Sequence, residues 1–262
     1  MIDFVRKESY GLKDLEEIVS LLRAPGGCPW DGEQTHESLR RGLLEESSEV
    51  VEAIDEASPE HLKEELGDVL LQVVFHADIE KDAGRFTLDD VADGICKKLI
   101  FRHPHVFGDT AVTGSDEVLV NWEELKREEK GQQTYTDTLT AVARSLPALW
   151  RAEKVQKKAK KTGFDWPDAS GAVDKLSEEL EELKEAMAQG TNIEEELGDL
   201  LFAAVNVSRF VKADPEEALT AATDKFISRF RKVEAFAAQE GRDMAQMGLS
   251  ELDQLWERAK RT

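Results

Sequence analysis

An acidic pattern that occurs twice constrains the fold of this chain more than any other feature of the sequence. Each copy reads Glu-Glu-x-x-Glu and is followed at some distance by Glu-Leu-Gly-Asp. Within each copy the acids form pairs three residues apart, which share one face of a helix. The paired acids are Glu46, Glu49, Glu65 and Asp68 in the first copy and Glu179, Glu182, Glu196 and Asp199 in the second. The copies are offset by 133 residues in their first part and 131 in their second, which predicts a tandem duplication of one helical unit.

Apolar residues follow each Glu-Leu-Gly-Asp motif at helical spacing. The first stripe is Leu66, Val69, Leu70, Val73 and Ala77, and the second is Leu197, Leu200, Leu201 and Ala204. Such spacing predicts amphipathic helices with one buried face. The acids border that face, which is where a helical bundle can hold a metal ion. We therefore predict an all-α fold made of two tandem helical domains.

The same periodicity predicts eleven helices along the chain. We expect them over 12–23, 36–57, 60–82, 88–101, 115–129, 138–145, 148–161, 171–188, 193–212, 215–240 and 249–260. Residues 131–136 lack the periodicity, so we expect one domain over 1–133 and another over 134–262.

Proline and glycine residues support these boundaries. Ser58-Pro59 and Asp214-Pro215 predict helix starts, because proline is favoured at the first helical position. Gly84, Gly163 and Gly190 predict helix ends.

The net charge of −21 limits the partners of this chain. An acidic surface repels DNA, RNA and anionic membranes, so we expect no nucleic-acid partner and no membrane partner. No apolar run approaches the roughly 18 residues of a membrane span, and residues 1–14 lack the apolar segment of a secretory signal. Two cysteines, Cys28 and Cys96, give no disulfide framework. We therefore expect a cytoplasmic protein.

The acid pairs predict a site for a hard cation. Carboxylates without thiol or imidazole ligands suit Mg²⁺, and Mn²⁺ could replace it. A lone Glu-Glu-x-x-Glu on a helix is usually a solvated face, but here each copy is also followed by a Lys-x-x-x-Arg pair. A di-iron site would need two Glu-x-x-His motifs, and only Glu33-x-x-His36 has that spacing.

Basic residues after each acidic motif predict a phosphate-binding face. Lys98 and Arg102 follow the first motif, and Lys225 and Arg229 follow the second, each pair four residues apart on one helix face. Triphosphate oxygens need such partners. Lys158 belongs to a run of lysines before Gly163. This run is either a solvated helix face or a surface that attracts phosphates.

Two tryptophan loops precede the acidic motifs, and a histidine segment follows the first. Trp30 and Trp166 lie in Cys-Pro-Trp-Asp and Gly-Phe-Asp-Trp, where the ring could stack on a base or fill the core. His103 and His105 form either a two-histidine metal site or a loop that caps a helix.

With these motifs together, the chain resembles the MazG family of tandem-domain nucleoside triphosphate pyrophosphohydrolases. The resemblance covers nearly the whole length and includes both tryptophan loops, both acidic motifs and the Arg102–Phe107 segment Arg-His-Pro-His-Val-Phe. It implies an all-α fold with two tandem four-helix-bundle-type domains and a homodimer whose site forms among packed helices. It also implies Mg²⁺-dependent hydrolysis of nucleoside triphosphates to the monophosphate and pyrophosphate.

The resemblance also implies residue roles. The metal ligands would be Glu179, Glu182, Glu196 and Asp199, with Glu46, Glu49, Glu65 and Asp68 matching them in the first domain. Lys225 and Arg229, or Lys98 and Arg102, would hold phosphates.

The two halves differ in ways that favour the second as the main catalytic domain. Aligning Asp199 with Asp68 sets Asn206 opposite Phe75 and Arg209 opposite Asp78. Asn206 lies two helical turns from Asp199 and can bind a sugar or phosphate, whereas Phe75 cannot. Glu178 is a candidate to accept the proton of the attacking water.

Two other hypotheses remain open from the sequence. One is a non-catalytic acidic helical scaffold that binds a basic partner protein. The other is the same chemistry on a narrower substrate such as dUTP or phosphoribosyl-ATP, although the tandem duplication and the Cys-Pro-Trp-Asp segment argue against both of these substrates.

Overall fold

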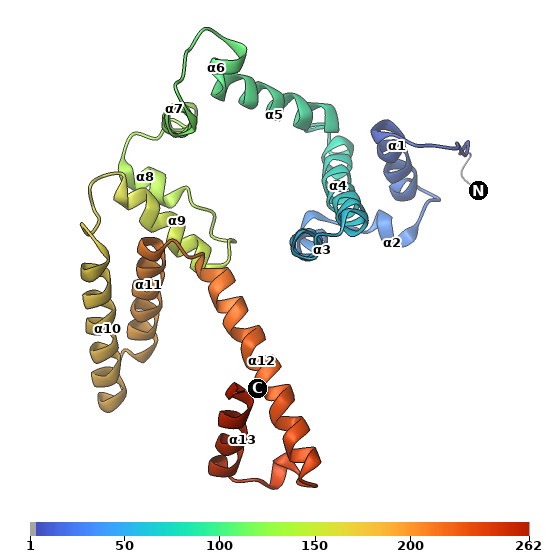
Figure 1. Cartoon of the computed structure of the whole chain (residues 1–262). Coiled ribbons are helices and arrows are strands. Elements are labelled where there is room, and N and C mark those ends of the chain that lie inside the picture. The colour runs from blue at the N-terminus through green and yellow to red at the C-terminus, as the bar shows by residue number, and fades with distance from the viewer. Residues whose placement is uncertain (1–3, 262) are drawn as a thin grey trace. The chain divides into compact units, whose positions relative to one another are not determined.

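The chain folds into two helical units. The computed structural model describes residues 4–261, except for the side chains of Asp116 and Leu119, and every regular element within that range is a helix. The units are Met1–Lys126 and Arg127–Thr262, and each contains one acidic motif (Figure 1). The all-α, tandem prediction is therefore confirmed. The division falls within α7 (Ser115–Glu129), and the finer boundary after residue 133 stays a prediction.

The first unit is built around a pair of long helices. Its helices are α1 (Leu12–Arg23), α2 (Pro29–Gly32), α3 (His36–Asp55), α4 (Pro59–Asp82), α5 (Leu88–Arg102), α6 (Pro104–Phe107) and the start of α7. α3 packs along α4, and α1 packs on the other side of α4 (Figure 1). The core cluster comprises Val19, Leu39, Val74, Phe75, Ala77 and Leu88. The pair α3–α4 holds the acids of the first motif.

The second unit repeats this arrangement. Its helices are α8 (Tyr135–Thr140), α9 (Ala148–Lys160), α10 (Ala169–Gln189), α11 (Ile193–Val211), α12 (Pro215–Gln239), the 3₁₀ helix η1 (Met244–Gln246) and α13 (Leu249–Arg261). α10 packs along α11, and α9 packs against α11 as α1 does against α4 (Figure 1). α12 packs mainly against α13, through Val233, Ala237, Leu255 and Ala259. No helix in residues 4–261 combines the length and apolarity that a bilayer span requires.

Local capping explains most helix boundaries. The Ser58 hydroxyl accepts a hydrogen bond from the His61 amide at 3.3 Å, and Asp214 accepts from the Glu216 amide at 2.9 Å, as expected of N-caps. Gly84, Gly163 and Gly190 adopt φ of +69°, +86° and +70°, which glycine tolerates at helix ends.

Three α-helices differ from the sequence predictions by more than two residues. The helix expected over 138–145 is α8, which begins at Tyr135 because the Thr134 hydroxyl caps the Asp137 amide at 3.1 Å. It ends at Thr140, well before Pro147, whose ring disfavours helical backbone in the preceding residue. α2 and α6 are short helices where loops were expected, and each begins at a proline, Pro29 or Pro104.

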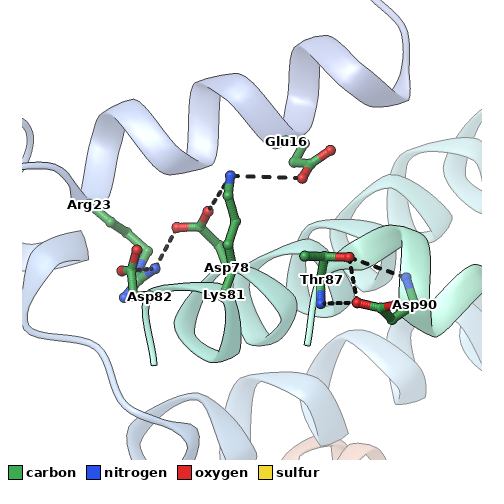
Figure 2. Close-up of polar contacts among 7 residues, drawn as sticks. All are labelled: Glu16, Arg23, Asp78, Lys81, Asp82, Thr87 and Asp90. Atoms are coloured by element: carbon green, nitrogen blue, oxygen red, sulfur yellow. Dashed lines mark hydrogen bonds and ion pairs between the residues drawn. The ribbon is translucent and has the colours of Figure 1, made fainter. Parts of the chain in front are cut away.

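A buried ion pair joins α1 to α4. The Arg23 guanidinium donates to the Asp78 carboxylate, and their side chains are only 9% and 2% exposed. Arg23 also lies 2.9 Å from Asp82, and Lys81 lies 3.8 Å from Asp78 (Figure 2). Burial in a low-dielectric region makes such a pair sensitive to loss of one partner.

The second unit has an equivalent ion pair with the charges exchanged. Arg209 of α11, which aligns with Asp78, donates from Nη2 to Asp165 Oδ2 at 2.7 Å. Asp165 lies in the loop after α9, and both side chains are largely buried. In each unit one buried ion pair thus joins the segment that precedes the acidic helix pair to the second helix of that pair, which is α4 in the first unit and α11 in the second.

Replacing Arg23 tests the first of these pairs. Arg23→Ala leaves Asp78 buried with only the more distant Lys81 nearby, so we expect the free energy of unfolding of the first unit to fall by about 3 kcal/mol. Chemical denaturation followed by circular dichroism measures this. Lys97→Ala, which removes an exposed pair with Asp93, is the control and should change stability by less than about 1 kcal/mol. Equal losses in the two variants would contradict a structural role for the buried pair.

Candidate metal centre and nucleotide site

Acids from two adjacent helices converge in each unit. In the second, carboxylate oxygens of Glu179 on α10 and of Glu196 and Asp199 on α11 all lie within 4.8 Å of one another. In the first, Glu46 and Glu49 of α3 form the same kind of group with Glu65 of α4. A cation that binds oxygen at about 2.0–2.6 Å can reach three atoms so placed. The donor set, which is carboxylate only, fits Mg²⁺ or another hard cation.

The fourth predicted ligand of each set, Glu182 or Asp68, interacts electrostatically with an acid of the group. Burial raises the pKa of Glu182, and the hydrogen bond and charge of Glu179 raise it further. Burial likewise raises the pKa of Glu46, with Asp68 and Glu49 adding repulsion. Three of the four predicted ligands therefore meet in each unit, whereas Asp68 and Glu182 are not members of the three-acid groups. The mutual repulsion of these acids favours binding of a cation.

Each group also has a basic neighbour that the sequence analysis missed. Lys175 Nζ lies 2.7 Å from Glu179 Oε1 and 2.9 Å from Glu178 Oε1, and these hydrogen bonds raise the pKa of Lys175. In the first unit His61 Nε2 lies 3.2 Å from Glu65 Oε1. Both bases stand four residues before the acid they contact, a spacing that could have identified them.

Lys175 contacts both Glu178 and Glu179, so it links Glu178 to one acid of the clustered group. Glu178 is exposed and is not among the three clustered acids, so its carboxylate remains available for a role other than metal binding.

The predicted phosphate-binding cations lie on a different helix from the acids. Lys225 and Arg229 belong to α12, whose main neighbours are α13 and α9, whereas α10 packs on α11. Lys158 lies in the last turn of α9. Next to Lys225, Phe226 contacts the ring of Trp256 on α13, a tryptophan the sequence analysis did not single out, with centroids 5.0 Å apart.

The two other predicted substrate-binding residues share a cavity. Trp166 and Asn206 both line a space of about 290 Å³ between α9, the loop after it and α11. The remaining lining residues are Val155, Gln156, Ala159, Gly163, Phe164, Asp165, Phe202 and Arg209.

The histidines of the first unit make polar and ring contacts. His103 ends α5 and its Nδ1 lies 2.6 Å from the Leu99 carbonyl, which supports the capping interpretation. His36 Nδ1 lies 2.7 Å from His76 Nδ1, and its Nε2 lies 2.5 Å from Glu80. Among the described residues, only the two acidic groups bring three possible metal ligands together.

Comparison with known proteins agrees with this geometry. The MazG nucleotide pyrophosphohydrolase domain matches residues 34–107 and 170–234, and each matched segment contains one acidic helix pair. These segments cover more than half of the chain. The chain belongs to the MazG family.

Relatives extend the likeness to MazG along nearly the full length. The Thermotoga maritima protein named nucleoside triphosphate pyrophosphohydrolase/pyrophosphatase MazG is 48% identical over 248 residues, 94% of this chain and 95% of its own. The Escherichia coli K12 nucleoside triphosphate pyrophosphohydrolase is 43% identical over 249 residues, 93% of this chain and 95% of its own. YabN of Bacillus subtilis, an uncharacterized protein, is 50% identical over 94% of this chain and 50% of its own length.

The raised acid pKa values predict how Mg²⁺ binding depends on pH. Protons and metal compete for Glu46, Glu65 and Glu182, whose pKa values lie above the ordinary range, so the affinity for Mg²⁺ should fall on acidification earlier than for ordinary carboxylates. Without metal, the folded state retains protons that the unfolded state releases, so these acids destabilise the fold as pH rises through their pKa values. We expect Mg²⁺ to raise the melting temperature more at about pH 7.5 than at about pH 5.

Differential scanning calorimetry with and without Mg²⁺ measures this effect. The double variant Glu65→Gln, Glu179→Gln should lose most of the Mg²⁺-induced shift, whereas Glu181→Gln, an exposed acid on α10 paired with Lys184, should keep it. A shift of the same size at both pH values would contradict metal binding at the two acidic groups.

Proposed function

We propose that this chain hydrolyses nucleoside triphosphates, with ribose or deoxyribose, to the monophosphate and pyrophosphate in a Mg²⁺-dependent reaction. The observation that carries the proposal is the meeting of Glu179, Glu196 and Asp199 within 4.8 Å, inside a segment that matches the MazG nucleotide pyrophosphohydrolase domain. Relatives named as nucleoside triphosphate pyrophosphohydrolases support it. The reaction would maintain the cytoplasmic nucleotide pool, where these substrates are found.

The residues of the second unit have separate roles in this proposal. Glu179, Glu182, Glu196 and Asp199 hold the metal, with Mn²⁺ able to replace Mg²⁺. When bound, Mg²⁺ supplies positive charge to the phosphate oxygens and makes water more acidic. Glu178, oriented by Lys175 at 2.9 Å, takes a proton from the attacking water. Lys225, Arg229 and Lys158 neutralise phosphate charge, and Asn206 and Trp166 contact the nucleoside.

We place the main catalytic site in the second unit. It differs from the first unit in having the cavity with Asn206 and Trp166 beside its acidic pair. The corresponding position to Asn206 in the first unit is Phe75, a buried member of the apolar core. The first unit keeps a complete set of acids, so it can bind metal without an adjacent nucleoside site.

Alanine variants of the two acidic groups test this assignment. Glu179→Ala should lower pyrophosphate release from nucleoside triphosphates by at least about 1,000-fold while preserving helical circular dichroism, because the metal loses a ligand. Glu49→Ala in the first unit and the exposed control Glu181→Ala should retain most activity. Loss of activity in Glu49→Ala with retention in Glu179→Ala would reverse the assignment. Failure of the unaltered protein to release pyrophosphate from any of a panel of triphosphates would favour the acidic scaffold instead.

We propose that a second copy of the chain completes the site. Exposed apolar side chains lie at helical spacing on α5 (Val91, Ile95 and Leu99) and on α12 (Phe226, Ile227 and Phe230), where they stay exposed although α12 packs against α13. α11 exposes Leu197 and Leu201 beside the metal ligands. Apolar faces of this extent usually pack against another protein surface. α12 from a partner copy would bury these apolar faces. It would also bring Lys225 and Arg229 to the acids of α10 and α11.

Mixing two inactive variants tests this shared site. We mix Glu179→Ala chains with Arg229→Ala chains. If Lys225 and Arg229 act across the interface, a mixed dimer has one site with both substitutions and one site with neither. Equal mixing should then restore roughly a quarter of the activity of the unaltered dimer, measured after exchange of subunits. Light scattering should give twice the chain mass. A monomer, or a mixture no more active than its components, would contradict a site shared between copies.

A further inference from the structure

The middle of α12 is a stretch of helix that is exposed on all sides within its own unit. Every residue over 217–228 is exposed, and α12 is buried further on at Val233 and Ala237, where α13 packs on it (Figure 1). The exposed stretch is about 18 Å long, at the usual helical rise per residue. Lys225 lies near its end and Arg229 just beyond it. Because packing within the chain does not hold this stretch, its direction must be set where α12 begins.

Two carboxylates join the start of α12 to the start of α9. The indole N–H of Trp150 in α9 donates to Asp214 Oδ1 at 2.9 Å and to Oδ2 at 3.0 Å. The backbone N–H of Leu149 donates to Glu216 Oε1 at 3.2 Å. Asp214 is the N-cap of α12 and Glu216 lies in its first turn. The first turns of the two helices are therefore hydrogen-bonded to each other at two points.

Asp214 holds both helices at once. Besides the Trp150 indole, its Oδ1 accepts from the backbone amides of Glu216 at 2.9 Å and Glu217 at 3.1 Å. Burial raises the pKa of Asp214, but the hydrogen bonds from Trp150 and from these two amides outweigh burial and lower that pKa. The carboxylate is therefore ionised at neutral pH, and a charged acceptor makes stronger hydrogen bonds than a neutral one.

The connection between α11 and α12 makes the direction of α12 depend on these hydrogen bonds. α11 ends at Val211, and Lys212 adopts a left-handed φ of +58° before Pro215 begins α12. So short a turn fixes where α12 begins, but rotations within residues 212–214 change its direction. Lys225 lies roughly 16 Å along the helix from Asp214, so a tilt of about 10° moves Lys225 by roughly 3 Å. Displacements of even about 1 Å at a reacting group lower rates strongly.

We propose that Trp150, Asp214 and Glu216 form an anchor whose three residues are positioning residues, which direct α12 toward the acids of a partner copy. The inference rests on the proposed function and its shared site. α9 packs against α11 as well as α12, so the anchor links the direction of α12 to the helix that carries Glu196 and Asp199. In a symmetric dimer each chain then acts on the phosphates at its partner's acids, although the anchor lies within one chain.

The double variant Trp150→Phe, Glu216→Ala tests the anchor because it removes both links to α9 and keeps Asp214 as the N-cap of α12. We expect the KM for ATP to rise about 10-fold with a smaller fall in kcat, because misdirected cations weaken phosphate binding before and during the reaction. The matched control is Trp122→Phe, Glu217→Ala, which makes the same changes in the first unit and at the next residue of α12. The control should keep the KM within about twofold.

Mixing experiments show on which side of the shared site the anchor acts. Mixed with Glu179→Ala chains, the double variant forms one site with intact acids and a correctly directed α12. Roughly a quarter of the activity of the unaltered dimer should then return after exchange of subunits. Mixed with Arg229→Ala chains, it forms no such site, and activity should stay below about a tenth. A general defect in the bundle around the acids would give the opposite pattern, which would overturn the proposal, as would a double variant as active as its control.

Trp150→Phe alone keeps the test decisive if the double variant folds poorly, as judged by circular dichroism. It should raise the KM about threefold and leave the mixture with Glu179→Ala more active than the mixture with Arg229→Ala. A lack of recovery when Glu179→Ala is mixed with Arg229→Ala would overturn the shared site and this inference with it. A failure of the proposed reaction would instead appear as no pyrophosphate from the unaltered protein.

Discussion

Repulsion between carboxylates on two packed helices is the constraint around which each unit is organised. Folding α10 onto α11 brings Glu179, Glu196 and Asp199 together, which costs electrostatic free energy unless positive charge is nearby. Lys175 and His61 each supply part of that charge beside one acid of their unit. The apolar contacts of the helix pair and the buried ion pair behind it must therefore hold the acids close until a cation binds. Burial, and after it the neighbouring acids, raises the pKa values of Glu46, Glu65 and Glu182.

Duplication has preserved this frame while the space beside it has diverged. In the first unit the inner helix contributes Phe75 to a closed apolar core, and in the second it contributes Asn206 to an open, partly polar cavity. Metal-binding capacity and nucleoside recognition are thus separable properties of one helical unit. Two groups of acids with different surroundings would allow the halves to specialise, one for chemistry and the other for assembly or a weaker activity.

The sequence predicted the fold and the meeting of the acids well because both depend on local patterns. Helical periodicity and caps such as Ser58 and Asp214 set the helices, and acids three residues apart had to share a face. α8 was misplaced because the capping pair Thr134 and Asp137 overrides weak periodicity. The hydrogen bond from Gln156 to the Phe202 carbonyl could not be predicted from the sequence, because it forms only once α9 packs on α11. The relation of Lys225 to the acids depends on packing that periodicity does not specify.

The exchanged ion pairs also bear on how a chain with two similar halves avoids folding incorrectly. Arg23 meets Asp78 in one half, and Asp165 meets Arg209 in the other. If the leading segment of one half docked on the inner helix of the other, arginine would face arginine and aspartate would face aspartate, each in a buried place. Either mismatch would be strongly unfavourable. Because the charges are reversed, each segment forms a favourable buried pair only within its own half. Two identical repeats would lack this discrimination.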